Sequence, residues 1–62
     1  MNQAKLRGII AENNMSQAQV AKSIGLSEKT FYRKMKKGIF GTDEVKRLID
    51  LLHIDNPVDI FL

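Results

Sequence analysis

Positive charge is concentrated between Lys29 and Lys37, where cationic side chains alternate with hydroxyl and aromatic ones. Guanidinium and ammonium groups donate hydrogen bonds to phosphate oxygens and to the acceptor atoms on the major-groove edge of guanine. Threonine adds a hydroxyl and a methyl group, which suit other base edges. The residue types of this stretch therefore have the chemistry to bind a polyanion such as DNA.

A helix must position these groups on one side. At about 100° per residue, Phe31 and Met35 fall on one face of a helix over 28–37. Lys29, Arg33 and Lys36 fall on the opposite face. We expect Ser27 to cap this helix and Gly38 to end it. Such a helix is held to a core by one side and offers the other side to a partner.

A second short helix is predicted just before it, over 17–24. Ser16 is a good N-terminal cap, and Gln19 stands three residues later, as in a capping box. Val20, Ala21 and Ile24 form its apolar face. Gly25 then allows the positive φ of a tight turn, after which we expect Leu26 to reach the core.

These two helices resemble the helix-turn-helix of the phage Cro and repressor proteins and of the small bacterial regulators related to them. The small Ala21 stands where the two helices must approach closely, and Gly25 stands at the turn. The chain departs from the commonest pattern because Met35 comes four residues after Phe31, where many relatives have three. The residues that carry the resemblance are Gln17, Val20, Ala21, Ile24-Gly25-Leu26, Ser27 and Thr30-Phe31.

By this resemblance, the second helix of the motif enters the major groove and its first residues reach the bases. The base-reading residues that it implies are Ser27, Glu28, Lys29, Thr30 and Arg33. The phosphate-binding residues that we expect are Gln17, Tyr32, Lys36 and Lys37.

Several of these positions also have a purely structural interpretation. Ser27 is either a base contact or fully used as a helix cap, and Glu28 equally suits the positive end of a helix. The Tyr32 hydroxyl meets a phosphate or merely covers Met35. We expect Lys34, nearer the buried side, to extend over apolar surface and reach solvent at its tip.

The remaining segments complete an all-α fold, a compact bundle of four to five short helices like the lambda-repressor DNA-binding domain. A first helix over 3–12 has Asn2 as its cap and an apolar stripe of Leu6, Ile9 and Ile10. Phe40 is expected to anchor the next loop by burial. A fourth helix begins after Thr42 as its cap and buries residues between Val45 and Leu52. Asn56-Pro57 starts a short fifth helix.

Charge divides unevenly along the chain. Residues 1–38 carry eight Lys and Arg against two Asp and Glu, a balance of +6, whereas residues 39–62 carry two against five, a balance of −3. One end of the molecule should therefore attract polyanions. Asp43 and Glu44 lie where related proteins approach the DNA backbone, and here they are expected to repel phosphate.

Size and composition exclude several functions. With 62 residues, no cysteine and one histidine, the chain has too few ligands for a metal site and no nucleophile–base pair for an enzyme. We expect one helix-turn-helix domain over 1–62, with the motif at about 16–38, and neither a cofactor nor a small-molecule ligand. No segment suits a signal peptide or a membrane span, so a cytoplasmic location is expected. We also expect no second domain for effector binding.

The sequence thus predicts a sequence-specific double-stranded DNA-binding regulator, in particular a Cro-like phage repressor that occupies a two-fold operator. A plasmid, toxin–antitoxin or host regulator of similar build would look the same. The alternative is a small protein-interaction module whose basic helix binds an acidic partner. We expect a homodimer at least on DNA. The apolar candidates for the dimer contact are Leu51, Val58, Ile60, Phe61 and Leu62. For residues 58–62 the alternative, packing on the first and fourth helices of the same chain, is favoured because so small a domain needs all its core.

Overall fold

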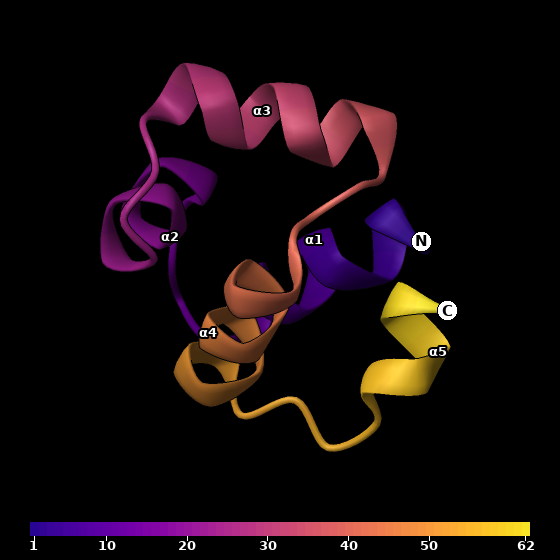
Figure 1. Ribbon diagram of the computed structural model, residues 1–62. Coiled ribbons are helices and arrows are strands. Elements are labelled where there is room, and N and C mark those ends of the chain that lie inside the picture. Colours follow the sequence, from indigo (N-terminus) through magenta and orange to yellow (C-terminus); the bar gives the residue numbers. More distant parts are fainter.

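The computed structural model describes all of residues 1–62 and contains five α-helices and no strand (Figure 1). This confirms the all-α bundle expected from the sequence. None of the helices has the length and apolar character needed to cross a bilayer. The helices are α1 (Gln3–Glu12), α2 (Gln17–Ser23), α3 (Glu28–Lys37), α4 (Thr42–Leu52) and α5 (Pro57–Phe61).

The arrangement leaves α3 along one side of the molecule. In Figure 1, α3 runs across the top, α2 lies below its left end, and α5 lies at the lower right. α2 packs on α3, and α1 contacts both α2 and α5. The two chain ends meet, because the backbone N–H of Asn2 donates to the carbonyl of Ile60 at 2.7 Å. α5 is therefore closed onto the start of the chain.

Local caps fix most helix ends, as the sequence predicted. The Asn2 side chain accepts the backbone N–H of Lys5 at 3.0 Å and starts α1. The capping box of Ser16 and Gln19 is present, with hydrogen bonds of 3.1 and 2.8 Å in the two directions. Both interactions satisfy backbone donors that the first helical turn leaves without a partner.

Two helix starts differ from the prediction. Thr42 is the first helical residue of α4 and not its cap; the cap is Gly41, whose N–H donates to the Glu44 carboxylate at 2.8 Å. The carboxylate thus satisfies the N–H of the cap residue itself, whereas glycine has no side chain to accept the N–H groups of the first turn of α4. Asn56 does precede α5 with Pro57 at the first position, but its side chain donates to Asp59 at 2.8 Å and makes no cap bond.

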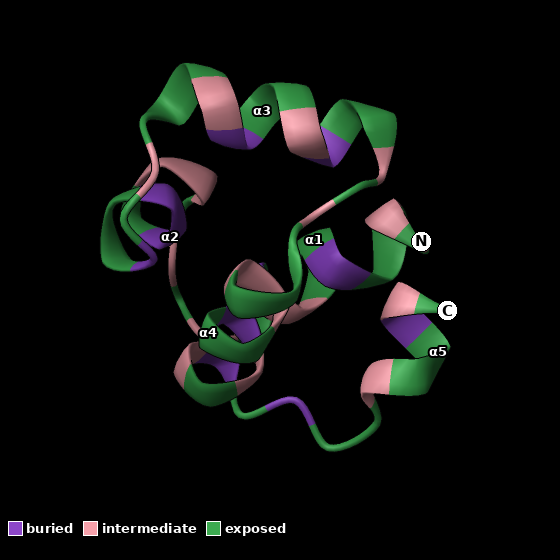
Figure 2. Ribbon diagram, viewed as in Figure 1, coloured by how far each residue is buried: buried purple, intermediate pink, exposed green.

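A single cluster of eleven buried side chains forms the core (Figure 2). Every helix contributes at least one of them, and none is polar. Ile9, Leu26 and Phe40, which the sequence placed inside, are only half-buried and pack against the edge of this cluster. The buried residues are Leu6, Ile10, Val20, Ala21, Ile24, Phe31, Met35, Leu48, Leu52, Ile54 and Ile60.

The C-terminal segment separates into an inner and an outer face. Ile60 is 1% exposed, so its proposed place in a dimer contact is wrong. Val58 and Leu62, by contrast, are 59% and 93% exposed. One turn of helix accounts for the split, since α5 turns Ile60 toward α1 while its neighbours face away. Among the dimer candidates only Ile60 is fully buried, while Leu51 and Phe61 are half-buried and pack against the edge of the core.

We therefore expect Ile60→Ala to lower the free energy of unfolding by about 2–4 kcal/mol, since it removes a buried aliphatic side chain and leaves a cavity. Val58→Ala, a change of similar chemistry on the exposed face of the same helix, should stay within about 0.5 kcal/mol of wild type. Urea denaturation followed by circular dichroism measures both. Equal losses in the two variants would contradict the burial of Ile60 within its own protomer.

Candidate nucleic-acid interface

α3 is attached to the core by two side chains. Phe31 is fully buried and Met35 is 4% exposed, and they are the only buried residues of this helix. Gly38 ends the helix with a φ of +74°, and the carbonyl of Lys34 accepts the N–H groups of Gly38 and Ile39 at 2.8 and 3.1 Å. The positive φ requires glycine, and a Cβ at Gly38 would also lie 2.9 Å from Nε2 of Gln3, which would have to move aside.

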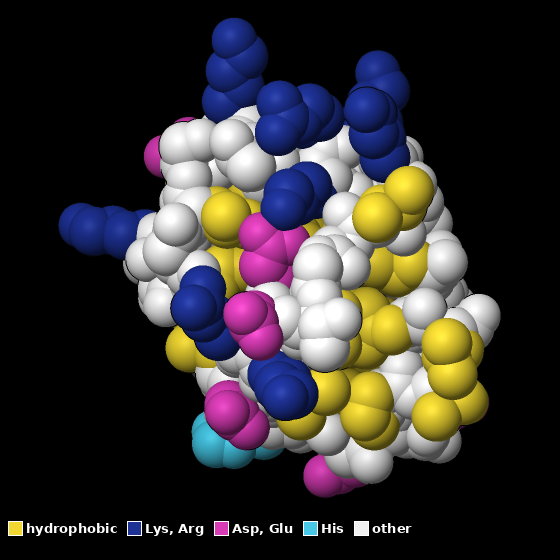
Figure 3. All heavy atoms as spheres, in the orientation of Figure 1, with side chains coloured by type: hydrophobic (Ala, Val, Ile, Leu, Met, Phe, Trp, Pro, Cys, Tyr) yellow, Lys and Arg dark blue, Asp and Glu magenta, His cyan; other side chains and the backbone are white.

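The rest of α3 faces outward and is polar. Lys and Arg side chains gather along it at the top of Figure 3, whereas most acidic side chains visible on this face lie below it. Among the expected base-reading residues, Ser27, Glu28, Lys29 and Arg33 are exposed and Thr30 is half-buried. All five lie in or directly before the first two turns of one helix.

The expected phosphate-binding residues come from two helices. Tyr32, Lys36 and Lys37 are exposed on α3. Gln17 is half-buried at the first position of α2, which packs on α3. The structure thus brings these groups to adjoining elements. The edge of the Tyr32 ring also meets Phe31, with centroids 6.3 Å apart, so part of the tyrosine covers the core.

The first turn of α3 contains a pair of hydroxyl groups in contact. Ser27 caps the helix, since its Oγ accepts the backbone N–H of Thr30 at 3.2 Å. The Ser27 hydroxyl also donates to Oγ1 of Thr30 at 3.0 Å. Ser27 therefore has the capping role that the sequence offered as one of its two interpretations.

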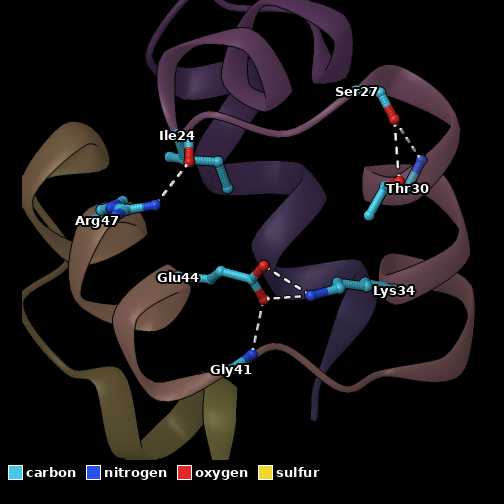
Figure 4. A network of polar contacts seen from close by, with 7 residues as sticks. All are labelled: Ile24, Ser27, Thr30, Lys34, Gly41, Glu44 and Arg47. Atoms are coloured by element: carbon cyan, nitrogen blue, oxygen red, sulfur yellow. Dashed lines mark hydrogen bonds and ion pairs between the residues drawn. The ribbon is translucent and has the colours of Figure 1, made fainter.

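α4 makes one polar contact to each helix of the motif (Figure 4). Lys34 of α3 donates to both carboxylate oxygens of Glu44, at 2.8 and 2.6 Å. Nη1 of Arg47 donates to the carbonyl of Ile24, at the end of α2, at 3.1 Å. Because the two side chains leave α4 one turn apart, this helix holds both halves of the motif at fixed positions.

These contacts correct two expectations. Lys34 does not extend over apolar surface to solvent but pairs with Glu44, whose side chain is only 12% exposed. Glu44 is consequently compensated by a cation beside it, and Asp43 alone of the two acids stands exposed without an ion pair. Arg47 was not identified from the sequence, because no local pattern links it to a carbonyl 23 residues away.

The pKa of Glu44 is lowered from its ordinary value of 4.5. The largest cause is the hydrogen bond from Lys34, followed by the one from the N–H of Gly41, and together they outweigh the opposing effect of desolvation. Because the pKa is lower in the folded protein, the ionised carboxylate stabilises the fold above pH 4.5. That contribution disappears as the pH falls through the lowered pKa.

An apolar groove lies away from α3, between the start of α4 and α5. Three of the expected dimer residues, Val58, Phe61 and Leu62, line it, and Leu51 does not. Phe40 and Val45 also line it, although the sequence predicted both as buried residues. Phe40 reaches the groove from the core edge, where its ring centroid is 5.4 Å from that of Phe31.

We expect Glu44→Gln to lower the free energy of unfolding by about 1 kcal/mol at pH 7, because the amide keeps the Gly41 hydrogen bond and loses the ion pair with Lys34. The difference from wild type should shrink as the pH falls below 4.5, where wild-type Glu44 becomes protonated. Denaturation with urea between pH 7 and pH 3 measures this.

Asp50→Asn removes one negative charge from an exposed position of the same helix and serves as the control. It should change the free energy of unfolding by no more than about 0.5 kcal/mol at pH 7. A Glu44→Gln deficit that does not depend on pH would contradict the role assigned to the ion pair.

Comparison with known proteins agrees with this geometry. No curated protein and no solved structure matches the chain. A family model, described as the antitoxin Xre-like helix-turn-helix domain, matches residues 6–53, a range that includes α2, α3 and α4. This domain falls in the Cro and repressor class of helix-turn-helix proteins, which confirms the resemblance for the class and leaves phage Cro itself as a prediction. The chain belongs to the antitoxin Xre-like helix-turn-helix domain family.

Proposed function

We propose that this protein is a transcriptional regulator that binds a specific double-stranded DNA sequence with α3 in the major groove. The observation that carries the proposal is the division of α3: two buried apolar side chains on one side, Phe31 and Met35, and an exposed, basic face on the other. An α-helix of this kind fits the width of the major groove. Membership of a helix-turn-helix family supports the same conclusion.

The proposed roles follow from the position of each side chain. The base edges are read from the first two turns of α3, by Glu28, Lys29, Thr30 and Arg33. Ser27, proposed as a base contact with them, lies directly before the first turn as the helix cap. Arg33 has the fork that matches O6 and N7 of guanine. The proposed phosphate contacts, Gln17, Tyr32, Lys36 and Lys37, hold the helix in register and make binding depend on salt. Lys34 is excluded because Glu44 occupies its ammonium group.

We further propose that the regulator is a repressor, as in Cro-like phage proteins, and that it occupies a two-fold operator and excludes polymerase from it. One α3 reads only a few base pairs, which is too little to select one site in a genome. Two copies on half-sites about 10 base pairs apart would read enough sequence. The two copies are proposed to contact each other through the exposed apolar residues of α5 and through Leu51 of α4.

Arg33→Ala should reduce the preference for the selected site by about 5- to 100-fold and leave salt-dependent, non-specific binding in place, because it removes a base contact and retains the phosphate contacts. The sites are duplexes selected by the wild-type protein from a randomised library. Fluorescence anisotropy across a salt series, with a scrambled duplex as reference, gives the preference.

Arg7→Ala is the matched control, since Arg7 is also exposed but lies on α1. It removes the same charge and should retain the full preference for the selected site. If wild type enriches no sequence from the library, the DNA-binding proposal is wrong, and an acidic protein partner becomes the function to test.

On a complete selected operator, sedimentation equilibrium should show two protomers per duplex. Leu62→Asp places a charge on the most exposed large apolar residue, directly after α5, and should reduce cooperative binding, while Ala11→Asp, on exposed α1 surface, should not. A single protomer on a complete operator would contradict the two-fold site.

A further inference from the structure

The ion pair between α3 and α4 holds one cation of α3 out of the set that can bind phosphate. The Lys34 ammonium donates to both carboxylate oxygens of Glu44, at 2.8 and 2.6 Å. Glu44 also accepts the backbone N–H of Gly41 at 2.8 Å, which anchors the carboxylate to the start of α4 (Figure 4). One N–H of the ammonium remains, but its positive charge is compensated within the protein.

Lys34 nevertheless lies where a free cation would meet DNA. Residues three and four apart share one face of a helix, so Lys34 lies beside Thr30 and Lys37. The first of these is a proposed base-reading residue and the second a proposed phosphate contact. The Lys34 side chain is 30% exposed, so it is accessible to a partner. The carboxylate of Glu44, and not burial, therefore keeps Lys34 from binding phosphate.

A free cation at this position would not act equally on all DNA. Binding to non-specific DNA depends almost entirely on phosphate contacts, and such a complex can shift until each free cation meets a phosphate. In the specific complex, base contacts fix the register, so an added cation gains a phosphate only where that register places one. A free Lys34 would thus strengthen non-specific binding more than specific binding.

We propose that Glu44 is a specificity-determining residue, which keeps Lys34 away from DNA phosphates and thereby limits binding to non-specific sequences. This inference rests on the proposed DNA-binding function and deepens it. It names a residue that sets the preference for the selected site through a neighbouring side chain, without contacting a base.

Two lysines on the same face of α3 provide the first test. On a scrambled duplex, the logarithm of the binding constant falls linearly with the logarithm of the salt concentration, by about 0.9 for each phosphate contact. Lys37→Gln should make this slope shallower by about 0.9. Lys34→Gln should leave the slope unchanged, because Glu44 already compensates this ammonium in the wild type. Fluorescence anisotropy across a salt series measures both slopes.

Glu44→Gln is the converse test. The amide keeps the Gly41 hydrogen bond and leaves the charge of Lys34 uncompensated. The slope on the scrambled duplex should become steeper by about 0.9, and non-specific binding should strengthen about 5- to 10-fold at about 0.1 M salt. The preference for the selected site over the scrambled duplex should fall by about threefold or more, because specific binding gains less.

Two further variants separate release of Lys34 from the mere loss of a negative charge. Asp43→Asn removes the same charge one position away, where no cation is paired, and should leave the slope unchanged. The double variant Glu44→Gln/Lys34→Gln should return both the slope and the site preference to wild-type values. Circular dichroism at the assay temperature confirms that the compared proteins are folded. Lys34→Gln retains the Glu44 carboxylate, so the first test does not depend on the stability of Glu44→Gln.

The outcomes are distinct. A shallower slope in Lys34→Gln, an unchanged slope in Glu44→Gln, or a steeper slope that persists in the double variant overturns the role of Glu44. A steeper slope in Glu44→Gln with an unchanged site preference also overturns it, since Glu44 would then set affinity and not specificity. If wild type enriches no site from the randomised library, the proposed function itself is wrong.

Discussion

The shallow attachment of α3 is the constraint on which the rest of the structure depends. Phe31 and Met35 are its only buried side chains, so nearly the whole outer surface of the helix remains available. A helix this polar has little reason to be stable by itself, because helices in proteins gain most of their stability from packing an apolar face. The other four helices supply the surroundings in which Phe31 is fully enclosed.

Apolar contact of this kind holds α3 in place but does not define its orientation well, because the hydrophobic effect has no direction. The two polar contacts of α4 supply direction. Glu44 accepts hydrogen bonds from Lys34 of α3, and Arg47 donates one to the carbonyl of Ile24 at the end of α2. The arrangement withdraws one cation, Lys34, from the basic face and leaves the others exposed. The orientation of α3 is thus better defined, and its exposed face carries one positive charge fewer.

The molecule separates a polar side from an apolar one. The basic face of α3 lies at the top of Figure 3, and the apolar groove beside α5 is lined by no residue of α3. Under the proposed function, contact with DNA and contact with a second copy do not compete. Ile60 makes this separation of the two surfaces possible, because it anchors α5 to the core while Val58 and Leu62 remain exposed.

The sequence alone predicts the helices, most of their caps and the outward face of α3, because periodicity and capping act within a few residues of the chain. It also determined the turn at Gly25, whose φ is +81°. Three features follow from the packing of the helices: Glu44 pairs with Lys34, Arg47 donates to the carbonyl of Ile24, and Ile60 is buried. Each depends on which helix lies across from which, and no local pattern contains that information. The cap of α4 also differs from the prediction, since it is Gly41 and not Thr42, and the Glu44 oxygen that accepts the Gly41 N–H also accepts from Lys34.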